Sequence, residues 1–221
     1  MEPLAYRMKP RTLDEFFGQE DIISKDKLLY RLIKADKLTS AIFWGPPGCG
    51  KTSLARIIAS TTKNKFVSLN ATTSGVSDIK QVVEEAQNIF TNPTGKVILF
   101  IDEIHRFNKL QQDALLPHVE KGTVILIGAT TENPYFSVNK ALISRSTVFK
   151  FSELKKEDVK NILKNCLQNK ERGLGGYNLD VREEAIDFLA ENSNGDVRTV
   201  LNALELAVLT TDMNSDGVIV I

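Results

Sequence analysis

Short apolar runs alternate with longer amphipathic stretches over roughly the first 150 residues. Val97–Ile101 is apolar without interruption, which is typical of a strand buried on both faces of a parallel sheet. The pattern predicts five strands: Ala41–Trp44, Phe66–Leu69, Val97–Ile101, Val124–Ala129 and Thr147–Phe151.

Between these strands, apolar residues recur every three or four positions, which predicts amphipathic helices. The predicted helices cover residues 25–37, Thr52–Ser60, Asp78–Phe90 and Gln111–Glu120. Strands that alternate with helices indicate a parallel sheet covered on both faces. The expected fold class is therefore α/β, an αβα sandwich with a five-stranded parallel sheet.

After about Ser152 the strand-like runs stop, and helical periodicity takes over. Three helices are predicted there, at Glu153–Lys170, Arg182–Glu191 and Asp196–Leu209. We therefore expect two domains, an α/β domain over residues 1–152 and a small all-helical domain over 153–221. Because the sequence ends on an apolar run, Val218–Ile221, we expect the chain to be part of a longer protein.

The charge and the composition exclude several classes of protein. Lysine and arginine number 28, as do aspartate and glutamate, so the formal net charge is zero. This excludes binding of nucleic acid by bulk positive charge, although a local basic patch remains open. Glycine (13) and proline (7) are too few for a low-complexity chain.

The cysteines and histidines indicate neither a disulfide framework nor a zinc cluster. Cys49 and Cys166 are the only cysteines, and His105 and His118 have no cysteine nearby. No apolar run approaches the roughly 20 residues of a membrane span, and the N-terminus does not resemble a signal peptide. We expect a reducing, cytoplasmic location and no membrane partner.

A phosphate-binding loop follows the first predicted strand and precedes a predicted helix. It matches G-x-x-x-x-G-K-[ST] at every fixed position: Gly45, Pro46, Pro47, Gly48, Cys49, Gly50, Lys51 and Thr52. Glycines let backbone N–H groups surround phosphate oxygens, and the helix N-terminus favours the same negative charge. Lys51 would reach the β- and γ-phosphates, and the Thr52 hydroxyl would ligate Mg²⁺.

This interpretation has two alternatives. A chance glycine turn is disfavoured because a strand precedes the loop and a helix follows it. The helix N-terminus could lower the pKa of the Cys49 thiol and make it reactive, but a purely backbone role for Cys49 is favoured. We expect the segment Gly45–Ser53 to bind the phosphates of a nucleotide.

An acidic pair, Asp102 and Glu103, ends the buried run at Val97–Ile101. Carboxylates at the edge of an apolar core need a cation or solvent, and a metal–phosphate site nearby would supply the cation. Asp102 would hold Mg²⁺ through water, and Glu103 would orient and activate the attacking water. An ordinary solvated loop is the alternative, and the presence of the phosphate loop counts against it.

Together these residues resemble an AAA+ ATPase of the clamp-loader and Holliday-junction-motor branch, and within it the replication-associated recombination protein A family. The segments that carry this resemblance span essentially the whole chain: Pro3–Pro10, Phe17–Glu20, Trp44–Thr52, Asp102–Lys109, Gln111–Glu120, Gly128–Pro134 and Ser144–Arg145. The stretch 102–134 is distinctive of this family. The resemblance implies a P-loop ATPase core followed by a helical lid.

The resemblance also implies roles for further polar residues. Thr131, expected to end a strand, matches the sensor 1 position, with a turn cap as the alternative. Asn70 matches the residue that can hold the catalytic glutamate inactive, and an ordinary turn asparagine is the alternative. Arg145 matches an arginine finger that serves the ATP of a neighbouring subunit. Arg198 matches sensor 2, which would couple the nucleotide state to a hinge-type motion.

Apolar residues that flank the adenine in related ATPases match Met8, Pro10, Ile22 and Ile23, for which ordinary packing is equally open. The sequence predicts no role for His105.

As an expectation, the family implies an ATP hydrolase that uses ATP and Mg²⁺ and depends on DNA, acting in replication fork maintenance, recombination and repair. The implied partners are DNA forks, gaps or ends, replication and repair proteins such as single-strand binding protein, and further copies of the chain. The family assembles as tetramers through a C-terminal region absent from these 221 residues, so this chain on its own is expected to be monomeric. The implied location is cytoplasmic and nucleoid-associated.

Two other functions stay open. One is an ATP-gated scaffold that recruits replication or repair proteins, in which hydrolysis only resets the switch. The other is a P-loop small-molecule kinase, which would need a pocket for a phosphoryl acceptor.

Overall fold

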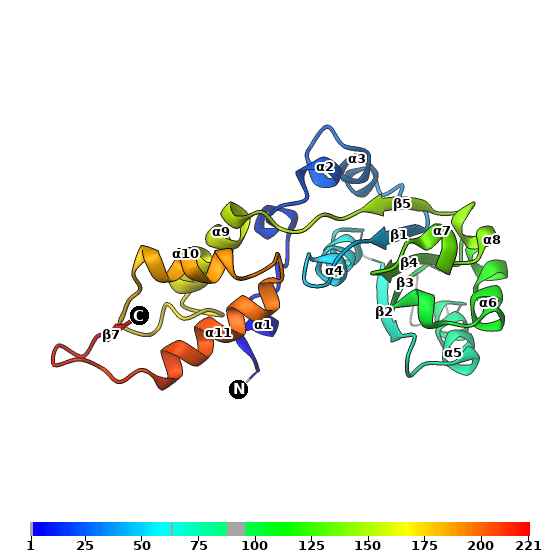
Figure 1. The fold of residues 1–221 in the computed structure, drawn as a ribbon. Coiled ribbons are helices and arrows are strands. Elements are labelled where there is room, and N and C mark those ends of the chain that lie inside the picture. Colours follow the sequence, from blue (N-terminus) through cyan, green and yellow to red (C-terminus); the bar gives the residue numbers. More distant parts are fainter. Residues whose placement is uncertain (1, 63, 88–95) are drawn as a thin grey trace. The chain divides into compact units, whose positions relative to one another are not determined.

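The computed structural model describes residues 2–62, 64–87 and 96–221. The chain folds into two compact units (Figure 1). Unit 1 comprises Met1–Gly18, Pro47–Cys49 and Glu153–Ile221, and unit 2 comprises Gln19–Pro46 and Gly50–Ser152.

Unit 2 contains a parallel sheet of five strands, which confirms the predicted α/β fold. The strands are β1 (Ala41–Trp44), β2 (Lys65–Asn70), β3 (Val97–Asp102), β4 (Val124–Thr130) and β5 (Thr147–Lys150). Their order across the sheet is β2-β3-β4-β1-β5. β4 therefore lies between β1 and β3, and the carboxyl ends of these strands meet at one edge of the sheet.

The register at this edge decides which side chains can act together. Trp44 of β1 lies opposite Thr130 of β4, and Asn70 of β2 lies opposite Asp102 of β3. In open α/β sheets, ligands bind outside the carboxyl ends of the strands. The phosphate loop and the acidic pair both follow strands at this edge, as the sequence predicts.

The helical elements of unit 2 have the following bounds: α2 (Glu20–Ile23), α3 (Leu28–Lys34), α4 (Lys51–Thr62), α5 (Val76–Gln87), η2 (Ile104–Arg106), α6 (Lys109–Glu120), α7 (Pro134–Ser137) and α8 (Lys140–Ile143). Each of the four predicted helices is present, with different ends. Residues 88–90 of one predicted helix lie outside the described part. A capping box between Asn108 and Gln111 starts α6, and Pro117 is accommodated inside that helix.

Burial on both faces of the sheet explains its uninterrupted apolar strands. Leu99 and Ile101 of β3 belong to the same buried cluster as Ile79 of α5 and Leu115 of α6. Because side chains alternate along a strand, Ile98 and Phe100 face the other side of the sheet, and both are equally buried.

Unit 1 is mainly helical, with α1 (Leu4–Arg7), η1 (Leu13–Glu15), α9 (Lys156–Gln168), α10 (Glu183–Glu191) and α11 (Val197–Thr210). The prediction that strands end before this part is wrong in one detail. β6 (Leu179–Asp180) pairs in parallel with β7 (Ile219–Val220). Two residues per strand are too few to produce an alternating pattern in the sequence.

The N-terminal residues fall in unit 1, although the sequence pattern predicts that they belong to the α/β domain. α1 packs against α11, and Leu4 is fully buried in the core of unit 1. An ion pair of 2.8 Å joins Arg7 Nη2 to Glu205 Oε1. These contacts link residues about 200 positions apart in the chain, so local periodicity could not reveal them.

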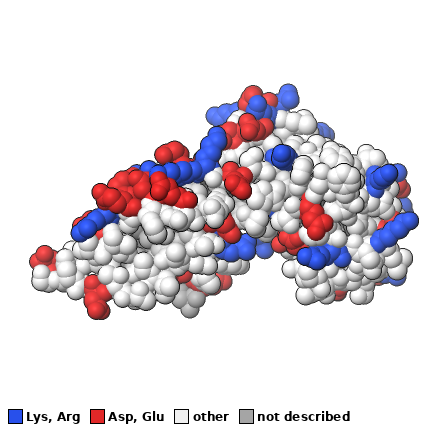
Figure 2. Space-filling model, in the orientation of Figure 1, with Lys and Arg blue, Asp and Glu red and all other residues white. Residues whose placement is uncertain are grey.

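Charged side chains of both signs lie together on the surface of unit 1 over α9 and α10 (Figure 2). Lys156 and Lys164 of α9 pair with Glu191 and Glu183 of α10 at 2.6 and 2.8 Å. The pairing fits a chain without net charge. This surface therefore carries charges of both signs and is neither acidic nor basic as a whole. Among the described residues, no helix combines the length and the apolar character needed to cross a membrane.

Candidate active site

The phosphate loop runs from the end of β1 to the first turn of α4. The backbone N–H of Gly45 donates to the carbonyl oxygen of Thr130 at 3.1 Å, which fixes the loop entry to the end of β4. Gly48 and Gly50 have φ angles of +72° and +100°, which residues with a Cβ adopt only with strain. The positive φ angles of the loop therefore explain why the motif has glycine at these two positions.

Gly45→Ala is expected to lower the free energy of unfolding by about 1–3 kcal/mol, as overpacking does in a tight interior. A Cβ at Gly45 would lie 2.7 Å from Phe151 Cβ and closer still to the Phe151 carbonyl oxygen, and backbone yields little. Urea unfolding would measure the change. Gly75→Ala is the matched control, because a Cβ there meets nothing nearer than 3.9 Å; equal losses in both variants would contradict the packing argument.

Lys51 begins α4 and is buried, with 8% of its surface exposed. Its Nζ donates to the carbonyl oxygens of Gly45 and Pro46 at 2.7 and 2.6 Å. The ammonium therefore lies inside the curve of the loop. A phosphate there would offer charged acceptors, which form stronger hydrogen bonds than neutral carbonyls.

The acidic pair lies at the end of β3, where both residues are half-buried. Asp102 is the last residue of the strand, and its Oδ1 accepts from the N–H of Glu103 at 3.2 Å. Glu103 is in the left-handed region (φ 54°, ψ 44°), which costs on the order of 1 kcal/mol for a residue with a Cβ. Strain of this kind is concentrated at functional sites, where it aims a side chain.

His105 contacts Glu103, and Thr130 and Glu132 contact His105; the sequence predicts no role for any of these three residues. The side chain of His105 is 4% exposed, and its Nε2 lies 3.3 Å from Glu103 Oε2 and 3.5 Å from Glu132 Oε1. Its Nδ1 lies 2.9 Å from the hydroxyl oxygen of Thr130. The position of His105, two residues after Glu103, was the only sign of its role in the sequence. Its other partners, Thr130 and Glu132, lie at and just after the end of β4, which is distant in the chain.

Thr131 and Asn70 differ from the expected picture. β4 ends at Thr130, so the expectation that Thr131 ends the strand is wrong by one residue, and Thr131 is exposed just beyond it. Asn70 Oδ1 accepts from the N–H and from the hydroxyl of Thr72 at 2.9 and 2.7 Å. This is the ordinary turn that the sequence left open for Asn70.

The two arginines lie in different units. Arg145 follows α8 in unit 2 and is exposed; its Nη2 pairs with Glu120 Oε1 at 2.7 Å, and its Nη1 donates to the Ala141 carbonyl oxygen at 2.9 Å. Arg198 is exposed in the first turn of α11 in unit 1.

The residues expected to hold Mg²⁺ fit that ion. A hydroxyl at Thr52 and a carboxylate at Asp102 are oxygen ligands, which Mg²⁺ prefers, and both residues are half-buried. Over residues 2–62, 64–87 and 96–221, no group of three or more His, Cys, Asp or Glu residues could hold a metal without other ligands. A site of this kind suits an ion that shares its coordination with nucleotide phosphates.

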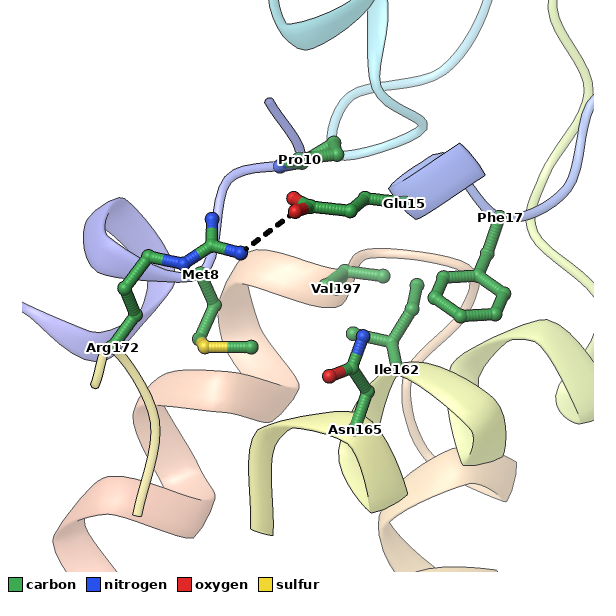
Figure 3. Close-up of a pocket in the computed structure, with 8 residues that line it drawn as sticks. All are labelled: Met8, Pro10, Glu15, Phe17, Ile162, Asn165, Arg172 and Val197. Carbon is green, nitrogen blue, oxygen red and sulfur yellow. Dashed lines mark hydrogen bonds and ion pairs between the residues drawn. The ribbon is translucent and has the colours of Figure 1, made fainter. Parts of the chain in front are cut away.

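Two of the four expected adenine contacts line a cavity in unit 1 (Figure 3). Met8 and Pro10 stand on its wall. The other lining residues are Glu15, Phe17, Ile162, Asn165, Arg172 and Val197. The wall is largely apolar, with one ion pair on its rim between Arg172 Nη2 and Glu15 Oε1 at 3.0 Å. Ile22 and Ile23 are half-buried on α2 in unit 2.

The ion pair at Glu15 predicts an acid-sensitive contribution to stability. Burial raises the pKa of Glu15, but hydrogen bonds from the Arg11 backbone and the Arg172 side chain outweigh it and hold the pKa below its usual 4.5. A lowered pKa in the folded state stabilises above pH 4.5, and this stabilisation is lost as the pH falls through the folded value. The advantage of the unchanged chain over Glu15→Gln should therefore shrink on acidification.

Thermal unfolding of both chains between pH 7 and pH 3 would check this. Glu171→Gln is the control, since Glu171 is 81% exposed and its contact with Arg11 is 4.0 Å long. A constant difference between the unchanged chain and Glu15→Gln across this range would refute the assignment.

Comparison with known proteins agrees with this geometry. The sequence pattern of the "ATPase family associated with various cellular activities (AAA)" matches residues 41–154, which include the phosphate loop, the acidic pair and Arg145. The chain belongs to this family.

Within the family, the predicted resemblance is confirmed by named relatives. Replication-associated recombination protein A of Bacillus subtilis is 44% identical over 98% of this chain and 50% of its own length. The protein of the same name from Coxiella burnetii is 50% identical over 92% of this chain and 46% of its own length. ATPase WRNIP1 of Dictyostelium discoideum is 48% identical over 93% of this chain and 23% of its own length.

Among solved structures, the RuvB Holliday junction branch migration motor of Thermotoga maritima has a TM-score of 0.73 with this chain. The two are 26% identical, and the match covers 92% of this chain and 65% of that protein. The chain thus spans about half the length of its bacterial relatives.

Proposed function

We propose that this chain is the ATP-hydrolysing part of an AAA machine that acts on DNA during replication and recombination. The observation that carries the proposal is the convergence of Lys51, Asp102 and Glu103 at one edge of the sheet. A phosphate loop without a carboxylate placed to activate water would give no reason to propose hydrolysis.

The proposed reaction uses electrostatics and positioning. Backbone N–H groups of the loop and the N-terminus of α4 would hold the phosphates, and Lys51 would leave its carbonyl partners for the β- and γ-phosphates. Thr52 and Asp102 would hold Mg²⁺, which when bound neutralises charge on the phosphates. Glu103 would accept a proton from the attacking water.

Three further residues, an arginine finger and two sensors, would complete the hydrolytic site. Arg145 would enter the site of a neighbouring copy, and to do so its guanidinium must exchange Glu120 for a phosphate. Thr131 and Arg198 would act as sensors, and a lid motion that moves Arg198 would report the nucleotide state. We propose assembly of several copies in the intact protein, because a finger supplied by a neighbour needs one.

The proposal for DNA rests on the names of the relatives. Two are replication-associated recombination proteins, and RuvB is named as a Holliday junction motor. With zero net charge, this chain offers no bulk attraction to DNA, so contacts must come from local groups or from other parts of the protein. Forks, gaps or strand ends are the proposed substrates, and single-strand binding protein is a proposed partner, in a cytoplasmic setting.

The test is the rate of ATP hydrolysis by the intact protein as a function of its concentration, with and without forked DNA. The proposal predicts that the rate per chain rises with concentration, because Arg145 acts on a neighbour, and rises again when DNA is added. A rate that no DNA changes would contradict the DNA part. A phosphorylated product other than free phosphate would indicate a kinase instead.

A further inference from the structure

Buried between Glu103 and the end of β4, His105 is the residue on which a further inference rests. Its imidazole contacts a hydroxyl through one nitrogen and two carboxylates through the other. Nδ1 is 2.9 Å from Thr130 Oγ1, whereas Nε2 is 3.3 Å from Glu103 Oε2 and 3.5 Å from Glu132 Oε1. A ring that is 4% exposed has few other partners available, so these contacts set its orientation.

The partners determine where the proton of the ring lies. Two carboxylates face Nε2, and since an ionised carboxylate only accepts hydrogen bonds, Nε2 must carry a hydrogen. In the neutral ring Nδ1 is then an acceptor, and the Thr130 hydroxyl supplies the matching donor. That hydroxyl oxygen also accepts from the N–H of Glu132 at 3.0 Å, which leaves its own hydrogen free to point at Nδ1.

The same direction holds if the ring is protonated. Both nitrogens then donate, and the Thr130 hydroxyl can turn to the carbonyl oxygen of Glu132 at 3.3 Å. In either state Nε2 carries a hydrogen and lies 3.3 Å from Glu103 Oε2, at ion-pair distance. The contact therefore does not depend on the protonation state of the ring.

Asn70, the residue expected to restrain the catalytic glutamate, is occupied elsewhere. Its side-chain oxygen accepts two hydrogen bonds within the turn that follows β2, and the residue is exposed. His105, by contrast, is within reach of the carboxylate of Glu103. It belongs to the short helix η2, whose N-cap is Glu103 itself in a left-handed conformation.

We propose that His105 is a positioning residue that holds the Glu103 carboxylate in place for water activation, and that the Thr130 hydroxyl fixes the direction in which His105 donates. This inference rests on the proposed function, in which Glu103 is the base. Outer-shell partners that orient the ligands of a metal affect activity by about 10–100-fold, and we expect an effect of the same order for a residue that orients a catalytic carboxylate. The effect falls on turnover, because the polar contacts of His105 are with Glu103, Glu132 and Thr130, and of these Glu103 is the proposed base.

The experiment compares His105→Asn with His105→Gln in the intact protein. The amide nitrogen of glutamine can stand near the place of Nε2 and donate to Glu103, whereas that of asparagine stands near Nδ1 and cannot reach Glu103. His105→Asn should lower kcat for ATP by about 10–100-fold with KM and ATP affinity unchanged, and His105→Gln should restore most of the loss. His118→Asn, at the other histidine of the chain, should leave kcat as it is.

Thr130 is tested in the same assay. Thr130→Val removes the hydroxyl and should lower kcat in the same sense, whereas Thr130→Ser should retain it. Because both residues act on one carboxylate, Thr130→Val should add little to the loss seen in His105→Asn. Additive losses would contradict the link between Thr130 and His105.

A double-mutant cycle with Glu103→Gln separates the two proposals. If Glu103→Gln leaves hydrolysis intact, the proposed function fails. If Glu103→Gln slows hydrolysis as predicted but His105→Asn and His105→Gln lose equal activity, only the positioning role fails. The inference predicts that His105→Asn has no further effect once Glu103 is glutamine.

Discussion

Glu103→Gln is expected to bind ATP with unchanged affinity and to hydrolyse it about 10²–10⁴-fold more slowly, the contribution typical of a positioned general base. Glutamine keeps the size of the side chain and its hydrogen bonding, but it cannot accept the proton of the attacking water. Phosphate release would measure turnover, and titration with a fluorescent ATP analogue would measure binding.

The matched control is Glu132→Gln, which makes the same chemical change at the other carboxylate beside His105. Glu132 is 58% exposed and stands farther from Nε2 than Glu103 does, so turnover should stay close to that of the unchanged protein. Equal losses of turnover in the two variants would show that the assignment of Glu103 as the base is wrong. If Glu103→Gln supports DNA-damage tolerance in cells as well as the unchanged protein does, an ATP-gated scaffold would replace the hydrolytic machine.

Arg145→Ala is expected to lower turnover by about 10³–10⁵-fold while ATP still binds, as the loss of an arginine finger does. The residue is exposed and held by Glu120 and by the Ala141 carbonyl oxygen, so its removal leaves the buried core of unit 2 intact. Lys140→Ala, a change of an exposed basic residue on the neighbouring helix α8, should have little effect.

Mixing variants tests whether Arg145 acts on a neighbour. A mixture of Arg145→Ala and Glu103→Gln chains should regain part of the activity, because one chain supplies an intact base and the other an intact arginine. No recovery in mixed assemblies, or an equal loss in a sample that contains single chains only, would show that Arg145 does not serve a neighbouring site.

The sequence predicted the sheet and the phosphate loop because both depend on local requirements. A strand buried on both faces is apolar throughout, as Val97–Ile101 is, and positive φ angles favour glycine, as at Gly48 and Gly50 of the loop. The acidic pair was also predictable from local sequence, since two carboxylates directly after a buried strand need a cation or solvent nearby.

Contacts between distant segments were not predictable in this way. The N-terminal helix joins unit 1 through Leu4 and Arg7, whose partners lie about 200 residues away. The setting of His105 also depends on β4, so its sequence position alone could not show that its ring contacts Glu103 and Thr130. Asn70 shows the opposite case: the family implied a role beside the glutamate, and the structure shows the local turn that the sequence left open as the alternative.

A crystal structure of the intact Glu103→Gln protein with ATP and Mg²⁺ is the measurement that tests the central claim most directly. The account predicts the β- and γ-phosphates among the backbone N–H groups of residues 45–52, with Lys51 turned from its carbonyl partners to the phosphates. It also predicts Mg²⁺ bound by Thr52 and Asp102, and a water beside residue 103. Nucleotide bound elsewhere, or side chains at 102 and 103 directed away from the phosphates, would contradict it.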